Sequence, residues 1–298
     1  RLKRDFRLDL RLRGIATSRQ MLLADPRLSV TEWRCLLTAA PPTDLHRFQE
    51  HVHPEHVPHA VVIDCSASAE VVERYPRWLA AGIHVVTPNK KANSGDSALY
   101  TRVQQARRLG GSHYLYEATV GAGLPIIQTL RDLRETGDQI RRIDGILSGT
   151  LSYLFNVWDG SQPFSALVWD AKARGYTEPD PRDDLSGVDV ARKLIILARE
   201  MGVGLELRDV ELESLIPASL AACSPEEFLD RLPELDATML NRFEAARAEA
   251  RVLRNVGVRD AATVRATVGL VALERSHPFS NINLKDNVVR FITSRYDQ

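Results

Sequence analysis

The stretch "AVVIDCSASAEVVERYPRWLAAGIHVVTP" (residues 60–88) contains a strand pattern, a helix pattern and a second strand pattern in close succession. Its first eight residues are mostly apolar, which is typical of a strand that is covered on both faces of a parallel sheet. The helical pattern that follows ends at Gly82, a residue type that commonly terminates helices. A second apolar run, IHVVTP, comes directly after this glycine. This order, with its short links, predicts a right-handed βαβ unit.

The same rhythm continues on both sides of this unit. Residues 97–111 have a helical pattern, residues 113–120 have a strand pattern, and residues 8–17 alternate as a strand entering the sheet would. We therefore predict an α/β fold, with a doubly wound, Rossmann-like parallel sheet in a nucleotide-binding domain over residues 1–117. No G-x-G-x-x-G motif precedes the first strand pattern, so this sheet is expected to lack its first strand and its glycine loop. Either the chain is truncated at its start, or this domain is not a cofactor domain.

A different pattern begins after residue 117, and it predicts an α+β region over residues 118–298. Its clearest element is "SGVDVARKLIILAREMG" (residues 186–202), in which apolar residues repeat at helical spacing. Residues 224–254 are highly charged and predicted to be helical, whereas residues 264–273 alternate as a strand does. The other elements predicted in this region are a strand over residues 139–149 and helices over residues 123–137, 150–158 and 164–175.

The overall charge excludes some classes of partner. Lys plus Arg and Asp plus Glu both number 39, so no net field attracts the chain to nucleic acid or to an anionic membrane. No apolar run approaches the roughly 18 residues that a membrane span requires. The three cysteines are odd in number and far apart, which favours reduced thiols and a cytoplasmic location.

The stretch "YTEPDPRDDLSGVDVARK" (residues 176–193) concentrates acidic residues ahead of a lysine. On the predicted helix, Asp189 and Lys193 are four residues apart and share a face. Three interpretations are open: a solvated loop with a surface ion pair, a cation cage, or a pocket for a positively charged group. Carboxylates beside one lysine suit the third, because they can grip an ammonium group while the lysine exchanges a proton with an oxygen. The other carboxylates of this stretch are Glu178, Asp180, Asp183 and Asp184.

Two basic residues follow predicted strands. In "TPNKKANS" (residues 87–94), Lys90 is either a solvated turn residue or a group that projects over the sheet edge, where a cofactor would lie. In "IATSRQ" (residues 15–20), no acid ends the strand, and Arg19 stands where a basic residue would accommodate a 2′-phosphate. This pattern favours NADP over NAD, unless Arg19 is simply solvated.

The stretch "EATVGAGLPII" (residues 117–127) places two glycines just before a predicted helix. Gly121 and Gly123 permit positive φ angles and close approach of the backbone. The turn would either direct carbonyl oxygens onto a monovalent cation or form a tight corner with no ligand.

Taken together, four stretches resemble one family. "TPNKKANS", "EATVGAGLPII", "GILSGTLSYLFN" (residues 145–156) and "GYTEPDPRDDLSGVDVARK" (residues 175–193) resemble homoserine dehydrogenase, and most of all the dehydrogenase half of bifunctional aspartokinase–homoserine dehydrogenases. The resemblance covers nearly the whole chain. It implies an oxidoreductase that interconverts L-aspartate 4-semialdehyde and L-homoserine with NADP, or with NAD, on the route to threonine and methionine.

The resemblance also implies roles for individual residues. Lys193 matches the lysine that donates a proton to the aldehyde oxygen, and Lys90 matches a lysine between nicotinamide and substrate. Arg19 and Ser66 match cofactor contacts. The residues that match substrate-binding positions are Glu178, Asp184, Asp189, Gly149, Thr150 and Tyr176. The residues whose backbone oxygens match a site for a sodium-type cation are Glu117, Val120, Ala122 and Leu124.

The same resemblance implies partners. The family forms homodimers or higher homo-oligomers, so residues 118–298 would serve dimerisation as well as catalysis. The family includes chains fused to an aspartokinase domain, and the resemblance leaves open whether the native chain carries such a domain. The family's terminal glycine-rich segments are missing from this sequence, which leads us to expect truncation at both ends. The rival hypothesis is a non-catalytic regulatory or assembly module that keeps the dehydrogenase fold. A weaker rival is a dehydrogenase for another amino-acid aldehyde.

Overall fold

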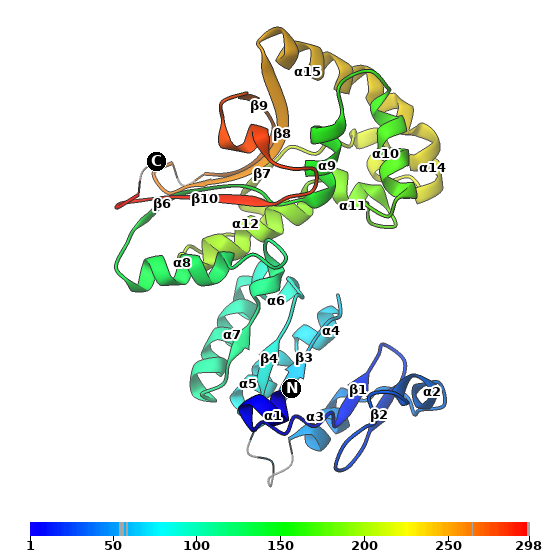
Figure 1. Cartoon of the computed structure of the whole chain (residues 1–298), viewed down its shortest axis with the longest axis vertical. Coiled ribbons are helices and arrows are strands. Elements are labelled where there is room, and N and C mark those ends of the chain that lie inside the picture. Colours follow the sequence, from blue (N-terminus) through cyan, green and yellow to red (C-terminus); the bar gives the residue numbers. More distant parts are fainter. Residues whose placement is uncertain (54–56, 58, 264, 297–298) are drawn as a thin grey trace. The chain divides into compact units, whose positions relative to one another are not determined.

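The structure is a computed structural model, and it describes residues 1–53, 57, 59–263 and 265–296. The chain divides into two compact units (Figure 1). Unit 1 comprises Arg1–Thr87 and Thr101–Leu115, and unit 2 comprises Pro88–Tyr100 and Tyr116–Gln298. None of the helices in the described part of the chain combines the length and the apolar character that a membrane span requires.

Unit 1 contains a parallel sheet of three strands in the order β3-β4-β5, which confirms the predicted βαβ unit. Trp78 and Leu79 of the connecting helix are buried with Ile83, Val85 and Tyr114 and form its core. The strands of unit 1 are β1 (Gly14–Ala16), β2 (Met21–Leu23), β3 (Val61–Ile63), β4 (His84–Val86) and β5 (Tyr114–Leu115). Its helices are α1 (Leu2–Phe6), α2 (Trp33–Leu37), α3 (Leu45–Val52), α4 (Ala69–Val72), α5 (Tyr75–Ala80) and the part of α7 (Ser97–Leu109) from Thr101 onward.

The prediction that residues 8–17 enter the parallel sheet is wrong. Only β1 is extended, and it pairs with β2 in a separate antiparallel sheet of two strands. The reason is local: the Thr17 hydroxyl accepts hydrogen bonds from the backbone N–H groups of Arg19 and Gln20, and this turns the chain back on itself. Within the described residues, β3 therefore pairs only with β4, and its Val61 and Ile63 are 42% and 65% exposed.

Unit 2 is built on a mixed sheet of five strands in the order β10-β6-β8-β9-β7, in which only the β7–β9 pair is parallel. The strands are β6 (Ile140–Ile146), β7 (Val210–Leu212), β8 (Arg251–Asp260), β9 (Ala266–Glu274) and β10 (Val288–Thr293). The α-helices are α6 (Lys91–Ser94), α8 (Ile126–Glu135), α9 (Gly149–Val157), α10 (Phe164–Ala173), α11 (Pro181–Leu185), α12 (Val188–Glu200), α13 (Ala218–Ala221), α14 (Pro225–Arg231) and α15 (Asp236–Ala248). The 3₁₀ turns are η1 (Glu117–Thr119), η2 (Leu207–Asp209), η3 (Leu232–Leu235) and η4 (Pro278–Asn281).

Two predicted boundaries are wrong. The strand predicted over residues 113–120 ends at Leu115 and is followed by η1, and the helical pattern of residues 224–254 runs into β8 at Arg251. The charge of β8 concealed this strand. Arg254 is buried, and its guanidinium donates hydrogen bonds to the carbonyls of Phe155 and Phe279. An arginine that is satisfied internally resembles a solvated one in the sequence.

Helix α12 lies very close to the sheet. A Cβ atom at Gly257 of β8 would lie 3.2 Å from Cγ1 of Val190, so the glycine allows this approach. Gly187, the residue before α12, has a φ of +72°, which favours glycine and sets the direction of the helix. The amino-terminal half of α12, with Asp189 and Lys193, is thereby fixed against the strands.

Candidate active site

The structure brings Lys90, Asp189 and Lys193 together in unit 2. Lys193 Nζ lies 2.8 Å from Asp189 Oδ2, and Lys90 Nζ lies 3.3 Å from Asp189 Oδ1. Asp189 and Lys193 are one helical turn apart on α12, whereas Lys90 is the residue immediately before α6. One carboxylate thus bridges two ammonium groups that come from distant parts of the sequence.

The environment of these charges differs from that of an exposed ion pair. The side chain of Lys193 is 14% exposed and that of Asp189 is 43% exposed. Burial opposes ionisation of Asp189, but the charges of Lys193 and Lys90 and their hydrogen bonds outweigh it, so the pKa of Asp189 is lowered from its ordinary value. The carboxylate therefore remains ionised at neutral pH and holds both lysines.

Two contacts fix the Lys193 ammonium group. Besides binding Asp189, Nζ donates a hydrogen bond to the carbonyl oxygen of Leu147 at 2.6 Å. An ammonium group has three N–H donors, so two are engaged and the third has no partner among the described residues. The group is held in place with one donor available to an incoming oxygen.

A second cluster forms around Asp184. Its carboxylate accepts the backbone N–H of Glu178 at 2.8 Å and interacts with the Thr150 hydroxyl. Thr150 in turn donates to the carbonyl of Tyr176 at 2.7 Å. Burial raises the pKa of Asp184, and the charges of Glu178 and Asp189 add to this effect, although the hydrogen bonds oppose it. The predicted acidic loop is partly helical, since Asp184 lies within α11.

Local packing positions the other predicted pocket residues. Gly149 and Thr150 open α9, where the Ser148 hydroxyl caps the helix by accepting the N–H of Leu151. The Tyr176 ring makes an edge contact with the Tyr153 ring, with centroids 4.9 Å apart. Thr150 and Tyr176 therefore lie beside Asp184 and Glu178, and this cluster is electrostatically coupled to Asp189.

The turn of residues 117–124 has an unusual backbone. Gly121 and Ala122 both have positive φ angles, of 72° and 53°. Leu124 and Glu117 accept hydrogen bonds from Ile126 and Val120, but the carbonyl oxygens of Val120 and Ala122 accept none from the described part of the chain. The Glu117 carboxylate is engaged elsewhere, because it accepts hydrogen bonds from the N–H groups of Ile127 and Gln128 at the start of α8. Neutral carbonyl donors of this kind suit a monovalent cation, and no group of three or more His, Cys, Asp and Glu among the described residues forms a metal centre.

Of the predicted cofactor residues, Lys90 lies in unit 2, whereas Arg19 and Ser66 lie in unit 1, where they do not line the same cavity. Ser66 follows β3 and lines a cavity of about 1790 Å³ together with Thr17, Ser18 and Ser68. Arg19 is exposed in the β1–β2 turn and does not belong to the described lining of this cavity. This open cavity runs along the whole of β3, from Ala60 to Ser66, and residues 8–18 line it as well.

Several positioning groups carry no sequence motif. The Leu147 carbonyl is a backbone group, and only the strand-to-helix turn of residues 145–149 marks its place. Asp64 is buried at the end of β3, where it accepts the N–H of Ser66 and the hydroxyl of Tyr75. Arg199 of α12 is buried and donates to two carbonyls of the α6 region, which fixes the helix that follows Lys90; these acceptors are Asn93 and Gly95.

Comparisons with known proteins identify relatives of this chain. Residues 125–298 match the family model described as homoserine dehydrogenase, and residues 1–117 match the model of the homoserine dehydrogenase NAD binding domain. The chain is 51% identical over 298 residues to bifunctional aspartokinase/homoserine dehydrogenase 1, chloroplastic, of Zea mays, covering 99% of this chain and 32% of that protein. The chain spans about a third of the length of this relative and of the similar Arabidopsis thaliana protein, bifunctional aspartokinase/homoserine dehydrogenase 2, chloroplastic.

Solved structures show the same fold. A Candida auris protein described as of unknown function is 36% identical, with a TM-score of 0.86, over 94% of this chain and 80% of that one. A putative homoserine dehydrogenase from Archaeoglobus fulgidus is 24% identical, with a TM-score of 0.74, over 98% of this chain and 83% of that one, and shows the fold alone.

Proposed function

The chain belongs to the homoserine dehydrogenase family, and we propose that it catalyses the NAD(P)H-dependent reduction of L-aspartate 4-semialdehyde to L-homoserine. The observation that carries this proposal is the bridge from Lys193 through Asp189 to Lys90, beside the acidic cluster of Asp184 and Glu178. These groups match the two ends of the substrate, an α-ammonium group that is bound and an aldehyde that reacts.

The aldehyde end is assigned to Lys193. As the carbonyl carbon accepts hydride, negative charge develops on the carbonyl oxygen, and a positioned ammonium group both neutralises this charge and donates a proton. Lys193 has one N–H donor available in the described structure, and Leu147 and Asp189 hold the other two. Lys90 adds a second positive charge on the opposite side of Asp189.

The amino end is assigned to the acidic cluster. Glu178 is exposed and has a free approach, and Asp184 has a raised pKa because it is buried near other acids. An ammonium group bound beside Asp184 favours its ionised form, so the charge of the substrate offsets the repulsion between the carboxylates. Thr150, Gly149 and Tyr176 would shape the pocket around it.

The cofactor is assigned to unit 1. NADPH, or NADH, supplies the hydride when it is bound, and Ser66 lines the cavity that would receive it. The parallel β3-β4-β5 sheet would be part of a doubly wound, Rossmann-like sheet, with its ligand beyond the strand ends. Arg19 remains our candidate for the 2′-phosphate and hence for a preference for NADP.

The turn of residues 117–124 is assigned to a sodium-type cation, which its carbonyl oxygens would bind. Gly121→Ala is expected to weaken this site and to lower Tm, because a Cβ there would lie 2.1 Å from Cδ1 of Ile126 at a φ of +72°. The conformational part alone costs about 1–2 kcal/mol. Thermal melts over a sodium chloride series measure both effects.

Gly123→Ala is the matched control for this change. Nothing lies within 4 Å of a Cβ atom at Gly123, so the free energy of unfolding of this variant should stay within about 0.5 kcal/mol of the wild-type value. Equal melting curves for the two variants would contradict the role of the turn geometry.

The proposed reaction is tested with the full chain, aspartate semialdehyde and NADPH, by following absorbance of the reduced cofactor. A non-catalytic module would show no turnover, and fluorescence titration with NADPH would then distinguish loss of cofactor binding from loss of chemistry. A panel of amino-acid aldehydes tests the weaker rival, a dehydrogenase for another amino-acid aldehyde. The acidic cluster also predicts that removal of the α-amino group from the semialdehyde abolishes its recognition. Turnover with a des-amino aldehyde equal to that with the semialdehyde would overturn the assignment.

Partners and location stay proposals. The Zea mays relative carries an aspartokinase in its name, and we propose the same fusion in the whole protein, together with a homodimer formed through unit 2. All three cysteines are free thiols in the described structure. We propose a cytoplasmic location, whereas the plant relative is described as chloroplastic.

A further inference from the structure

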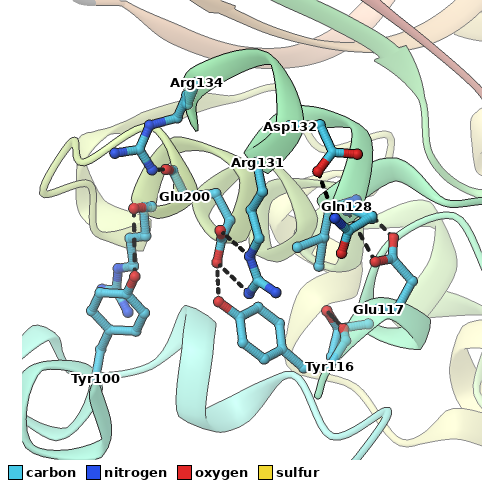
Figure 2. Close-up of polar contacts among 11 residues, drawn as sticks. Tyr100, Tyr116, Glu117, Gln128, Arg131, Asp132, Arg134 and Glu200 are labelled. Atoms are coloured by element: carbon cyan, nitrogen blue, oxygen red, sulfur yellow. Dashed lines mark hydrogen bonds and ion pairs between the residues drawn. The ribbon is translucent and has the colours of Figure 1, made fainter. Parts of the chain in front are cut away.

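A buried ion pair lies at the far end of α12 from the active-site lysine. Glu200, the last residue of α12, is 7% exposed, and its carboxylate accepts hydrogen bonds from Arg131 Nε at 2.9 Å and Nη2 at 3.2 Å. The Tyr116 hydroxyl donates to the same carboxylate, and the Arg131 guanidinium stacks over the Tyr116 ring. Figure 2 shows these side chains converging on Glu200. The proposed mechanism uses none of them.

The partners of Glu200 flank the turn of residues 117–124 on both sides. Tyr116 immediately precedes it, and Arg131 lies on α8, which immediately follows it. Arg134 of α8 also donates to the backbone carbonyl of Glu200. Both ends of the turn are therefore tied to the carboxyl end of the helix that carries Lys193.

The turn is fastened internally as well. The Glu117 carboxylate accepts the backbone N–H groups of Ile127 at 2.7 Å and Gln128 at 3.0 Å, which joins its first residue to the first turn of α8. Between these attachments the chain adopts two successive positive φ angles, one of them at Ala122. A non-glycine residue in this conformation is held there by its surroundings, not by its own preference.

Burial makes the loss of either partner of the Glu200–Arg131 ion pair costly. Desolvation lowers the pKa of Arg131 from its ordinary value, although the charges of Glu117, Tyr100 and Glu135 oppose this effect. The side chain of Glu200 is only 8% exposed where it binds this guanidinium. A buried ion pair is often no more stabilising than apolar residues of similar volume, whereas removing one partner is costly because the other stays buried without compensation. The pair therefore contributes geometry more than stability.

We propose that Glu200 is a positioning residue that holds both flanks of the 117–124 turn and thereby sets its affinity for a monovalent cation. This inference rests on the proposed cation role of the turn. Groups outside the direct ligands of a metal typically change its affinity by about 10- to 100-fold when they are mutated. Glu200 acts in this way through Tyr116 and α8, without touching the cation or the substrate.

The test measures the sodium dependence of Tm, with choline chloride added to keep ionic strength constant. For Glu200→Gln, the sodium concentration that gives half of the full rise in Tm is expected to increase by at least about tenfold. Glu213→Gln is the matched control, since Glu213 pairs with Arg242 at 2.6 Å between the end of β7 and α15. It should lower Tm but keep the wild-type midpoint. Tyr116→Phe, which removes only one donor, should shift the midpoint in the same direction by about threefold and keeps the test valid if Glu200→Gln does not fold.

The outcomes separate the two proposals. If the wild type shows a sodium-specific rise in Tm and the Glu200→Gln and Tyr116→Phe midpoints equal that of the wild type, the positioning role is overturned and the cation site stands. A midpoint shift of the same size in Glu213→Gln would also overturn it. If sodium and choline affect the wild type equally, the cation site itself falls, and the positioning role falls with it, whatever the reductase assay shows.

Discussion

Lys193→Ala is expected to lower kcat by about 10²–10⁴-fold, the range typical of a residue that transfers a proton in the transition state. KM for the semialdehyde should change little, because the acidic cluster at Asp184 and Glu178 remains to bind the amino end. The loss should appear in kcat and kcat/KM together, since the interaction is made only as the alkoxide forms. Steady-state kinetics with NADPH oxidation as the readout measures it, and fluorescence titration should give an NADPH affinity within about twofold of the wild type.

Arg192→Ala is the control for this experiment. Arg192 adjoins Lys193 on α12, and its replacement by alanine removes the same charge from the same helix. Consecutive helical residues point in different directions, so Arg192 does not share the position of Lys193. Its kcat should stay within about threefold of the wild type. Near-normal turnover by Lys193→Ala, or an equal loss in Arg192→Ala, would remove Lys193 from the role of proton donor.

The parts of the fold that the sequence predicts correctly are those in which the local pattern and the tertiary environment agree. Strand β4 of the βαβ unit and the long helix α12 bury the apolar residues that their patterns indicate, whereas β3, predicted to be covered on both faces, leaves Val61 and Ile63 exposed. The segment around β1 did not follow its alternating pattern, because a hydrogen-bonded turn at Thr17 gave it a closer partner in β2. Such competition between partners is invisible in a window of ten residues.

The candidate site divides in the same way. A spacing of four placed Asp189 and Lys193 on one helical face, and the structure shows that contact at 2.8 Å. The contact of Asp189 with Lys90 joins two parts of the sequence that no local pattern links, so only the resemblance grouped them. Leu147 contributes a backbone carbonyl, for which any residue type would serve, and Glu200 looks like an ordinary charged helix end. The roles of backbone carbonyls and of buried charged side chains therefore could not be predicted from the sequence.

The bridge at Asp189 explains why the two lysines can share one small region. Two ammonium groups at this separation repel each other, and burial makes the repulsion stronger than in water. The ionised carboxylate between them, at 2.8 Å and 3.3 Å, compensates both, and its lowered pKa is the reciprocal effect of the lysine charges on it. The arrangement thus depends on the charge of Asp189 and not merely on its hydrogen bonds.

Asp189→Asn, which keeps the shape and removes the charge, is accordingly expected to lower kcat/KM by at least about a hundredfold, or about 2.7 kcal/mol in transition-state stabilisation. Unlike Lys193→Ala, it should raise KM as well as lower kcat, because Lys90 and Lys193 would repel each other out of position and a carboxylate assigned to the substrate's polar groups would be lost. Separate determination of kcat and KM for the semialdehyde distinguishes the two patterns.

Asp183→Asn is the matched control for the loss of one negative charge near this site. Asp183 is exposed on α11, and its carboxylate has no hydrogen bond to the described residues, so both constants should stay within about twofold of the wild type. In kcat, the double variant Asp189→Asn/Lys193→Ala should lose little more than Lys193→Ala alone, because residues that act as a unit are not additive, and its KM should rise as in Asp189→Asn. Full additivity of the two losses would mean that Asp189 acts independently of Lys193, and the bridge would then be a structural contact without a part in the reaction.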